Sequence, residues 1–174
     1  IVLSPGVPHD MEPLRAAKNT GIPVTGELEL SSRLIDTPMI AVTGTNGKST
    51  VTALLGTLLK NASLKAFVGG NIGTPLIAYV EGEEKADYVV VEVSSFQLDT
   101  IETFCPFISL LLNISPDHLD RYASYEDYAQ SKLRIFMNQK PGQHVILNDD
   151  DEALATINPP SGVSVLRYGD KRKE

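Results

Sequence analysis

The sequence lacks the features that mark secreted and membrane-spanning proteins. It holds one cysteine, Cys105, which cannot form a disulfide within the chain. No secretory signal is recognisable, and no apolar run reaches the roughly 18 residues that a membrane helix needs. We therefore expect a cytoplasmic protein in a reducing setting, with no membrane partner.

Basic residues are also scarce. The chain has 15 Lys and Arg against 22 Asp and Glu, and its formal net charge is −7. No basic stripe is present that could neutralise a nucleic-acid backbone, so nucleic acid is not expected as a partner. Any polyanion that binds must be small and locally held.

What the sequence does contain is ordinary for a globular protein. Its 174 residues are 42% hydrophobic and 21% charged, which is enough for one well-filled core. The chain opens on Ile1 within a strand-like run and ends in the charged run 169–174. We expect a fragment of a longer protein that is monomeric.

Four apolar runs define the expected sheet. They do not alternate with polar residues, which is typical of strands buried on both faces in a parallel sheet covered by helices. The runs cover residues 39–43, 88–93, 107–114 and 144–148. Helical periodicity at 49–61 and 125–137, and short helices expected at 74–80 and 94–101, complete an open α/β sheet. In such sheets ligands bind at the carboxyl ends of the strands.

The first 36 residues have a different pattern. A strand at 1–6, a helix at 11–21 and a second strand within 22–35 indicate the last βαβ piece of a preceding, Rossmann-like domain. We therefore divide the chain into the end of a first domain, residues 1–36, and a main α/β domain, residues 37–174.

The strongest motif lies at 41–50 and reads AVTGTNGKST. An apolar strand runs into a loop and directly into a helix, which is the context that a phosphate-binding loop requires. Its residues are Gly44, Thr45, Asn46, Gly47, Lys48, Ser49 and Thr50. Glycines let backbone N–H groups converge on phosphate, Lys48 brings a positive charge, and Ser49 offers a hydroxyl to Mg²⁺. The usual pattern has Gly where this chain has Val42, so a turn that binds no nucleotide stays open as an alternative.

Three other segments are expected near this loop. Glu92 ends an apolar strand, and a buried carboxylate there would find its compensating partner in the nucleotide's Mg²⁺, unless it faces solvent or pairs with a lysine. His118 lies between two aspartates and could bind a metal, although a lone histidine is more often a surface residue. The glycines of 69–75 form a simple turn or let a substrate approach the backbone closely.

Lys132 interrupts the apolar side of the helix expected at 125–137. Residues on that side are predicted to be Tyr125, Tyr128, Ala129, Leu133, Ile135 and Phe136. Those predicted to point away are Asp127, Gln130, Ser131 and Arg134. A lysine in such a place usually extends its ammonium group past the core to water.

Taken together, these segments resemble the Mur ligases of peptidoglycan synthesis. The resemblance rests on AVTGTNGKST, GGNIGTPL, VVVEVSSFQL, NISPDHLDRY and SKLRIF in this order, and upstream on SPGVP and GELEL. Within the family, SSFQL resembles the members that add D-glutamate to UDP-N-acetylmuramoyl-L-alanine. This implies a P-loop ATPase-like central domain at 37–174, which is incomplete, after the end of a UDP-substrate-binding domain at 1–36.

The resemblance implies an ATP-dependent ligase that forms an amide bond. ATP would phosphorylate the carboxylate of the UDP-sugar substrate to an acyl phosphate, and the amine of D-glutamate would then displace phosphate. The family's adenine contacts come from a later part of the central domain, and its D-glutamate contacts come from a C-terminal domain absent from this chain. We expect little or no ligase activity from the chain alone.

The resemblance also assigns roles to single residues. Residues 44–50 match the ATP loop, and Ser49 and Glu92 match ligands of the Mg²⁺ that accompanies ATP, with Mn²⁺ as an alternative. His118 matches a ligand of a second metal near the acyl phosphate, where it also reaches substrate.

Three further matches concern the substrate, and a fourth concerns a modified lysine. Ser4, Gly6 and Asn71 match contacts of the UDP-sugar substrate. Lys132 matches a lysine that CO₂ converts to a carbamate, which binds metal as a carboxylate does. Burial favours the neutral amine of a lysine, and the neutral amine is the form that captures CO₂.

Three other functions stay open at this point. A P-loop kinase or GTPase would share the loop and the acidic strand. Another Mur ligase or a folylpolyglutamate synthase would use a different acceptor and amino acid. A non-catalytic domain would keep the fold without its chemistry. The residues that argue against this are the intact Lys48, Ser49, Glu92, His118 and Lys132.

Overall fold

The computed structural model describes residues 1–4, 6–8, 11–116 and 121–170. The strands are β1 Val2–Leu3, β2 Thr25–Gly26, β3 Met39–Thr43, β4 Ala66–Gly70, β5 Tyr88–Glu92, β6 Ile108–Leu111, β7 His144–Asn148 and β8 Ser164–Tyr168. The helices are α1 Glu12–Asn19, α2 Glu27–Ser32, α3 Lys48–Asn61, α4 Ile77–Glu81, α5 Ser95–Leu98, α6 Tyr125–Leu133, the 3₁₀ helix η1 Arg134–Phe136 and α7 Glu152–Ala155. Within these ranges, no helix has the length and apolar character needed to cross a bilayer.

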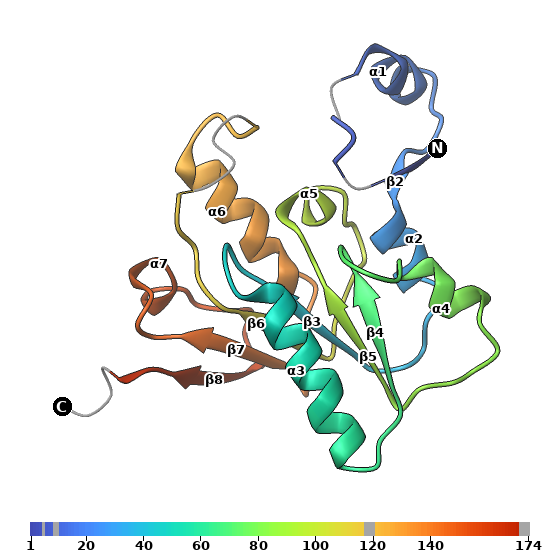
Figure 1. Cartoon of the computed structure of the whole chain (residues 1–174). Helices are drawn as coiled ribbons and strands as arrows, with labels where there is room; N and C mark the ends of the chain where they lie inside the picture. The colour runs from blue at the N-terminus through green and yellow to red at the C-terminus, as the bar shows by residue number, and fades with distance from the viewer. Residues whose placement is uncertain (5, 9–10, 117–120, 171–174) are drawn as a thin grey trace.

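The main sheet has six parallel strands in the order β4-β5-β3-β6-β7-β8 (Figure 1). β3 lies between β5 and β6, so the chain leaves β3 in one direction to form β4 and returns across it to form β6. A separate pair, β1 and β2, is also parallel. The α/β class and the parallel arrangement expected from the sequence are confirmed.

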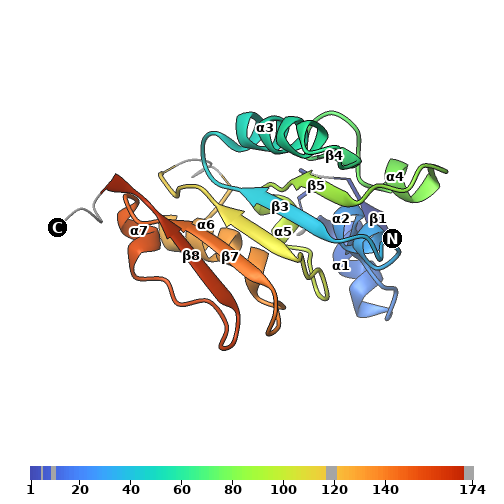
Figure 2. The same ribbon diagram turned by 90° about the horizontal axis from the view of Figure 1, so that it is seen from below.

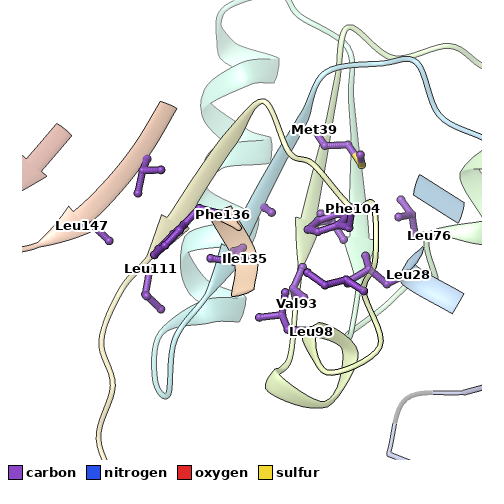
Figure 3. Packing of buried hydrophobic residues seen from close by; sticks show 14 of the residues in the cluster. Leu28, Met39, Leu76, Val93, Leu98, Phe104, Leu111, Ile135, Phe136 and Leu147 are labelled. Carbon is purple, nitrogen blue, oxygen red and sulfur yellow. The ribbon is translucent and has the colours of Figure 1, made fainter. Parts of the chain in front are cut away.

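Helices cover both faces of this sheet. Figure 2 shows α3 on one face and α5, α6 and α7 on the other. Successive residues of β3 alternate between the two sides: Ile40 and Val42 pack with residues of α3, whereas Met39 and Ala41 join the larger core on the opposite face. Figure 3 shows this larger core, in which Phe104 fills the space between strands and helices. Because both faces are covered, the strands are apolar without alternation.

The strands predicted at 39–43 and 144–148 are confirmed at the same residues. The strand predicted at 88–93 ends one residue earlier, and the one predicted at 107–114 is half as long, covering 108–111. β4 and β8, the two strands at the edges of the sheet, were not predicted. β8 is largely exposed, and Leu166, for example, is 57% exposed. An exposed edge strand needs no continuous apolar run in its sequence.

The first part of the chain forms the predicted βαβ unit, with one difference. β1, α1 and β2 follow in order, but the second strand ends at Gly26 and residues 27–32 are helical. Acidic side chains at Glu27 and Glu29 favour the first turn of a helix because they complement its dipole. Leu28 of this helix is buried in the larger core of the main sheet. The domain boundary at residue 36 stays a prediction.

The helix predicted at 125–137 is present as α6 followed by η1. Two of its polar residues were placed wrongly. Ser131 is buried and donates to the carbonyl of Ser95 at 2.8 Å, and Arg134 is half-buried and donates to the carbonyls of Leu98 and Ile101. These carbonyls belong to α5 and the segment that follows it, so polar side chains of α6 and η1 face inward there.

Candidate functional site

The phosphate-loop motif is a short connection between β3 and α3. Gly44 has φ +155° and Gly47 has φ +82°, backbone conformations that residues other than glycine rarely adopt. A Cβ at Gly44 would also lie 3.1 Å from the Cβ of Leu112. Backbone conformation therefore favours glycine at both positions, and the close approach of the segment after β6 adds a second reason at Gly44.

Hydrogen bonds hold the loop in place from the segment that follows β6. The N–H of Thr45 donates to the carbonyl of Asn113 at 3.0 Å, and the Asn113 side chain bonds both the N–H and the carbonyl of Asn46. The Thr45 hydroxyl accepts from the N–H of Ser115 at 3.0 Å and lies 3.1 Å from the Tyr128 hydroxyl. The loop is thus held in its conformation by protein contacts.

The N-terminus of α3 has no side-chain cap, whereas Ser94, Ser124 and Asp151 cap α5, α6 and α7. Its first backbone N–H groups are therefore not used by a capping side chain and suit an anion. Lys48 begins this helix and donates to the carbonyl of Thr45 at 2.9 Å. Ser49 and Thr50 are exposed beside it.

Glu92 ends β5 directly beside the loop strand. It pairs with Val42 of β3 on one side and with Gly70 of β4 on the other. Glu92 is only 1% exposed, and its Oε1 accepts a hydrogen bond from Asn71 Nδ2 at 3.2 Å. Oε2 is buried and has no hydrogen-bond partner among the described residues. The prediction of a buried carboxylate is confirmed, and the alternative that faces solvent is wrong.

Lys132 reaches the same loop from α6. It is 2% exposed, and its Nζ donates to the carbonyl of Gly44 at 2.9 Å. The ammonium also lies 4.7 Å from the ring centroid of Tyr128. The alternative in which this lysine extends its ammonium group to water is therefore wrong, and its contact with a phosphate-loop carbonyl places it at the candidate site.

Ser4 and Gly6 do not join this group. They follow β1 and line a separate small cavity with Phe96 and Gln97 of α5. The carbonyl of Gly6 accepts from Arg121 at 3.1 Å. The structure therefore brings together the loop, Glu92, Asn71 and Lys132, and leaves the residues after β1 apart from them. His118 lies outside the described residues.

Sequence reasoning missed several residues that shape the site. Asn113 and Tyr128 anchor the loop, and the position of Asn113 at the end of an apolar strand was a usable signal. Ser94 and Gln97 form a capping box at the start of α5, which the spacing Ser-x-x-Gln indicates. Gln97 is buried, and its Nε2 has no partner within the described part of the chain.

The segment before α6 also contacts the C-terminal end of α5. The Tyr122 hydroxyl donates to Asp99 at 2.7 Å and lies 3.2 Å from the Ser131 hydroxyl. Burial is the largest cause that raises the pKa of Tyr122 to about 12, and the Asp99 carboxylate raises it too. The phenol is therefore a protonated donor at neutral pH and ties the segment before α6 to α5.

Metal ligands are sparse within the ranges that the structure describes. No three His, Cys, Asp or Glu side chains gather there in a way that could hold a metal ion. A cation beside the loop would therefore depend on Glu92, on the hydroxyl of Ser49 and on oxygens of its own ligand.

The parallel sheet and the anchored loop define a P-loop-type α/β domain. A family model described as the Mur ligase middle domain matches residues 42–174, and the chain belongs to the Mur ligase family.

Comparisons with individual proteins agree with this assignment. The chain is 57% identical over 152 residues to a UDP-N-acetylmuramoylalanine–D-glutamate ligase of Desulfatibacillum aliphaticivorans, over 87% of this chain and 34% of that protein. It is 51% identical to a ligase of the same description from Pelotomaculum thermopropionicum, over 100% of this chain and 38% of that protein. The chain thus spans little more than a third of the length of these relatives.

A solved structure shows the same fold at lower sequence identity. The crystal structure of MurF ligase from Thermotoga maritima in complex with ADP matches with a TM-score of 0.65 and 18% identity, over 97% of this chain and 47% of that chain.

Proposed function

We propose that this chain is the ATP- and metal-binding part of a ligase that joins D-glutamate to UDP-N-acetylmuramoyl-L-alanine in the cytoplasm, during peptidoglycan synthesis. The choice of substrates rests on the description of the relatives at 51% and 57% identity. The single structural observation that carries the chemistry is Glu92, a buried carboxylate beside the phosphate loop with one oxygen unpartnered among the described residues.

In this proposal the loop holds the phosphates of ATP. Backbone N–H groups at the start of α3 bind phosphate oxygens, and Lys48 places its charge on the β and γ phosphates after leaving the carbonyl of Thr45. Asn113, Ser115 and Tyr128 keep the loop in shape before the nucleotide arrives, which reduces the conformational entropy lost on binding.

The residues present fit a hard cation. Glu92 offers a buried oxygen without a partner in the described chain, and Ser49 offers an exposed hydroxyl at the first turn of α3. Mg²⁺ or Mn²⁺ held there would neutralise charge that builds on the phosphate oxygens. Asn71 orients the carboxylate by donating to its other oxygen.

A second metal would be held by His118 and by a carbamate on Lys132. The position of Lys132 supports this proposal, since its amine is buried and reaches the loop carbonyl of Gly44. Reaction with CO₂ would replace a buried cation by a carboxylate-like ligand. The MurF relative bound to ADP has the same fold, which is consistent with nucleotide binding here.

The reaction would proceed through an acyl phosphate. The substrate carboxylate attacks the γ phosphate of ATP, ADP leaves, and the amine of D-glutamate then displaces phosphate from the acyl group. The protein's part is to position the reactants and stabilise charge. Ser4, Gly6 and Asn71 would contact the UDP-sugar substrate, residues 1–36 would end its binding domain, and residues 37–174 would begin the ATP-binding domain of a monomeric enzyme.

The full-length protein tests this proposal. Phosphate release from ATP is measured with UDP-N-acetylmuramoyl-L-alanine and D-glutamate together, with each alone, and with a panel of other amino acids. The proposal expects release only when both substrates are present. Release that ignores both substrates would indicate a kinase- or GTPase-like activity, and release with a different amino acid would indicate another ligase of the family.

A further inference from the structure

Glu29 is a fully buried carboxylate in α2 that is surrounded by hydrogen-bond donors. Its Oε2 accepts from the N–H groups of Glu102 and Phe104, each at 2.9 Å. Its Oε1 accepts from the N–H of Thr103 at 2.9 Å, from the Thr103 hydroxyl at 2.6 Å and from Arg33 Nε at 2.8 Å. Three successive backbone N–H groups therefore converge on one side chain.

These donors keep the carboxylate ionised. Burial by itself raises the pKa of Glu29, but hydrogen bonds from Thr103, from the N–H of Glu102 and from Arg33 outweigh it and lower the pKa to about 2. The contact therefore persists as a charge-assisted one at neutral pH.

Glu29 connects two parts of the molecule that are distant in sequence. α2 begins directly after β2, and β2 pairs with β1, which leads into Ser4 and Gly6. The three N–H donors follow α5, the helix that begins three residues after Glu92. The carboxylate thus ties the β1–β2 pair to the segment at the end of α5.

The small cavity named above lies between these two parts. It is lined by residues of both, among them Ser4, Gly6, Gly26, Phe96, Gln97 and Thr100. A Cβ placed on Gly26 would lie 2.3 Å from the Thr100 hydroxyl, so the two sides are in close contact. The width of the cavity therefore depends on how α2 is held against the end of α5.

We infer that Glu29 is a positioning residue for the UDP-sugar substrate: it holds α5 against the β1–β2 pair and so maintains the cavity beside Ser4 and Gly6. This inference rests on the proposed function, in which those two residues contact that substrate. The phosphate loop has separate anchors in Asn113 and Tyr128, so ATP binding does not depend on Glu29.

The test uses the full-length protein with Glu29→Gln, which keeps the volume but turns an NH₂ group toward backbone N–H donors. KM for UDP-N-acetylmuramoyl-L-alanine, KM for ATP, kcat and the melting temperature are measured. We expect KM for the UDP-sugar substrate to rise about tenfold, while KM for ATP and kcat change by less than about twofold.

Two further variants serve as controls. Glu102→Gln removes an exposed carboxylate that pairs with Arg33, and it should leave both KM values unchanged. Thr103→Val removes one of the donors to Glu29 and should raise KM for the UDP-sugar substrate about two- to threefold. It keeps the inference testable if Glu29→Gln does not fold.

Each outcome decides between a positioning and a purely structural role. A lower melting temperature with an unchanged KM for the UDP-sugar substrate would overturn the inference, as would an equal rise in both KM values. Should Glu29→Gln fail to fold, an unchanged KM in Thr103→Val overturns it. A wild-type protein that neither binds nor turns over the UDP-sugar substrate overturns the proposed function and this inference with it.

Discussion

Two buried glutamates of this chain have opposite surroundings. Glu29, at the junction of α2 with the segment after α5, accepts hydrogen bonds on both oxygens from backbone N–H groups, a hydroxyl and a guanidinium. Glu92, beside the phosphate loop, accepts one long hydrogen bond from Asn71, and its other oxygen has no partner within the described ranges. Both residues are at most 1% exposed.

The difference teaches how the two carboxylates are used. A buried carboxylate that is fully hydrogen-bonded holds protein segments together. A buried carboxylate with a bare oxygen costs free energy unless something outside the chain compensates it. On this view Glu29 belongs to the framework that holds the segments beside Ser4 and Gly6, and Glu92 belongs to a cation-binding site. Variants of Glu29 should lower stability and raise KM for the UDP-sugar substrate, whereas variants of Glu92 should lower turnover.

The largest effect is expected at the phosphate-loop region, from Lys48→Ala. In the proposed function Lys48 contacts the ATP phosphates, so loss of its charge should lower kcat/KM of the full-length protein by about ten-thousandfold. Lys60→Ala, at the other end of the same helix, is the matched control and should keep normal turnover. Near-normal rates of phosphate release in Lys48→Ala would refute the loop assignment.

Lys132→Ala removes the lysine of α6 that reaches the same loop. If a carbamate is the metal ligand, turnover should fall about a thousandfold and recover partly when acetate or another short carboxylate is added. Lys140→Ala, an exposed lysine, is the control. Full activity in Lys132→Ala without any carboxylate would remove the carbamate from the proposal.

The contribution of Glu29 to stability is tested by lowering the pH. The pKa of Glu29 is lowered from 4.5 to about 2 in the folded state, so its contribution is present above pH 4.5 and is lost as the pH falls toward 2. That contribution is at most about 3 kcal/mol. Urea unfolding at pH 7 and at pH 3 should show wild type losing more stability with acid than Glu29→Gln. An equal loss in both proteins would contradict the assignment.

The smallest effect that still separates the two carboxylates is expected from Glu92→Gln. Loss of a metal ligand should reduce turnover about a hundredfold and raise the Mg²⁺ concentration needed for half-maximal activity. The melting temperature without nucleotide should stay the same or rise, because a buried charge with a bare oxygen is removed. Glu81→Gln, on the surface, is the control. A marked fall in melting temperature would place Glu92 in the framework with Glu29.

Apolar runs were a reliable guide to the inner strands of the sheet. β3 and β7 were predicted to the residue, although β3 is buried throughout and the burial of β7 alternates along the strand. β8 gave no such signal, since an edge strand with Leu166 exposed needs no apolar run. Ser131 was assigned to the outer face because a period of 3.6 residues says nothing about which carbonyls lie opposite the helix.

Local sequence alone determined the parallel α/β class, the phosphate loop with its two glycines, and the presence of a lysine on the inner side of α6. The tertiary structure decided which polar groups are compensated. The sequence marked Glu92 through the apolar strand that it ends, whereas nothing in it marked Glu29 as buried. The backbone donors around Glu29 come from residues more than 70 positions away, and only the packing of α2 against the end of α5 brings them within hydrogen-bond reach.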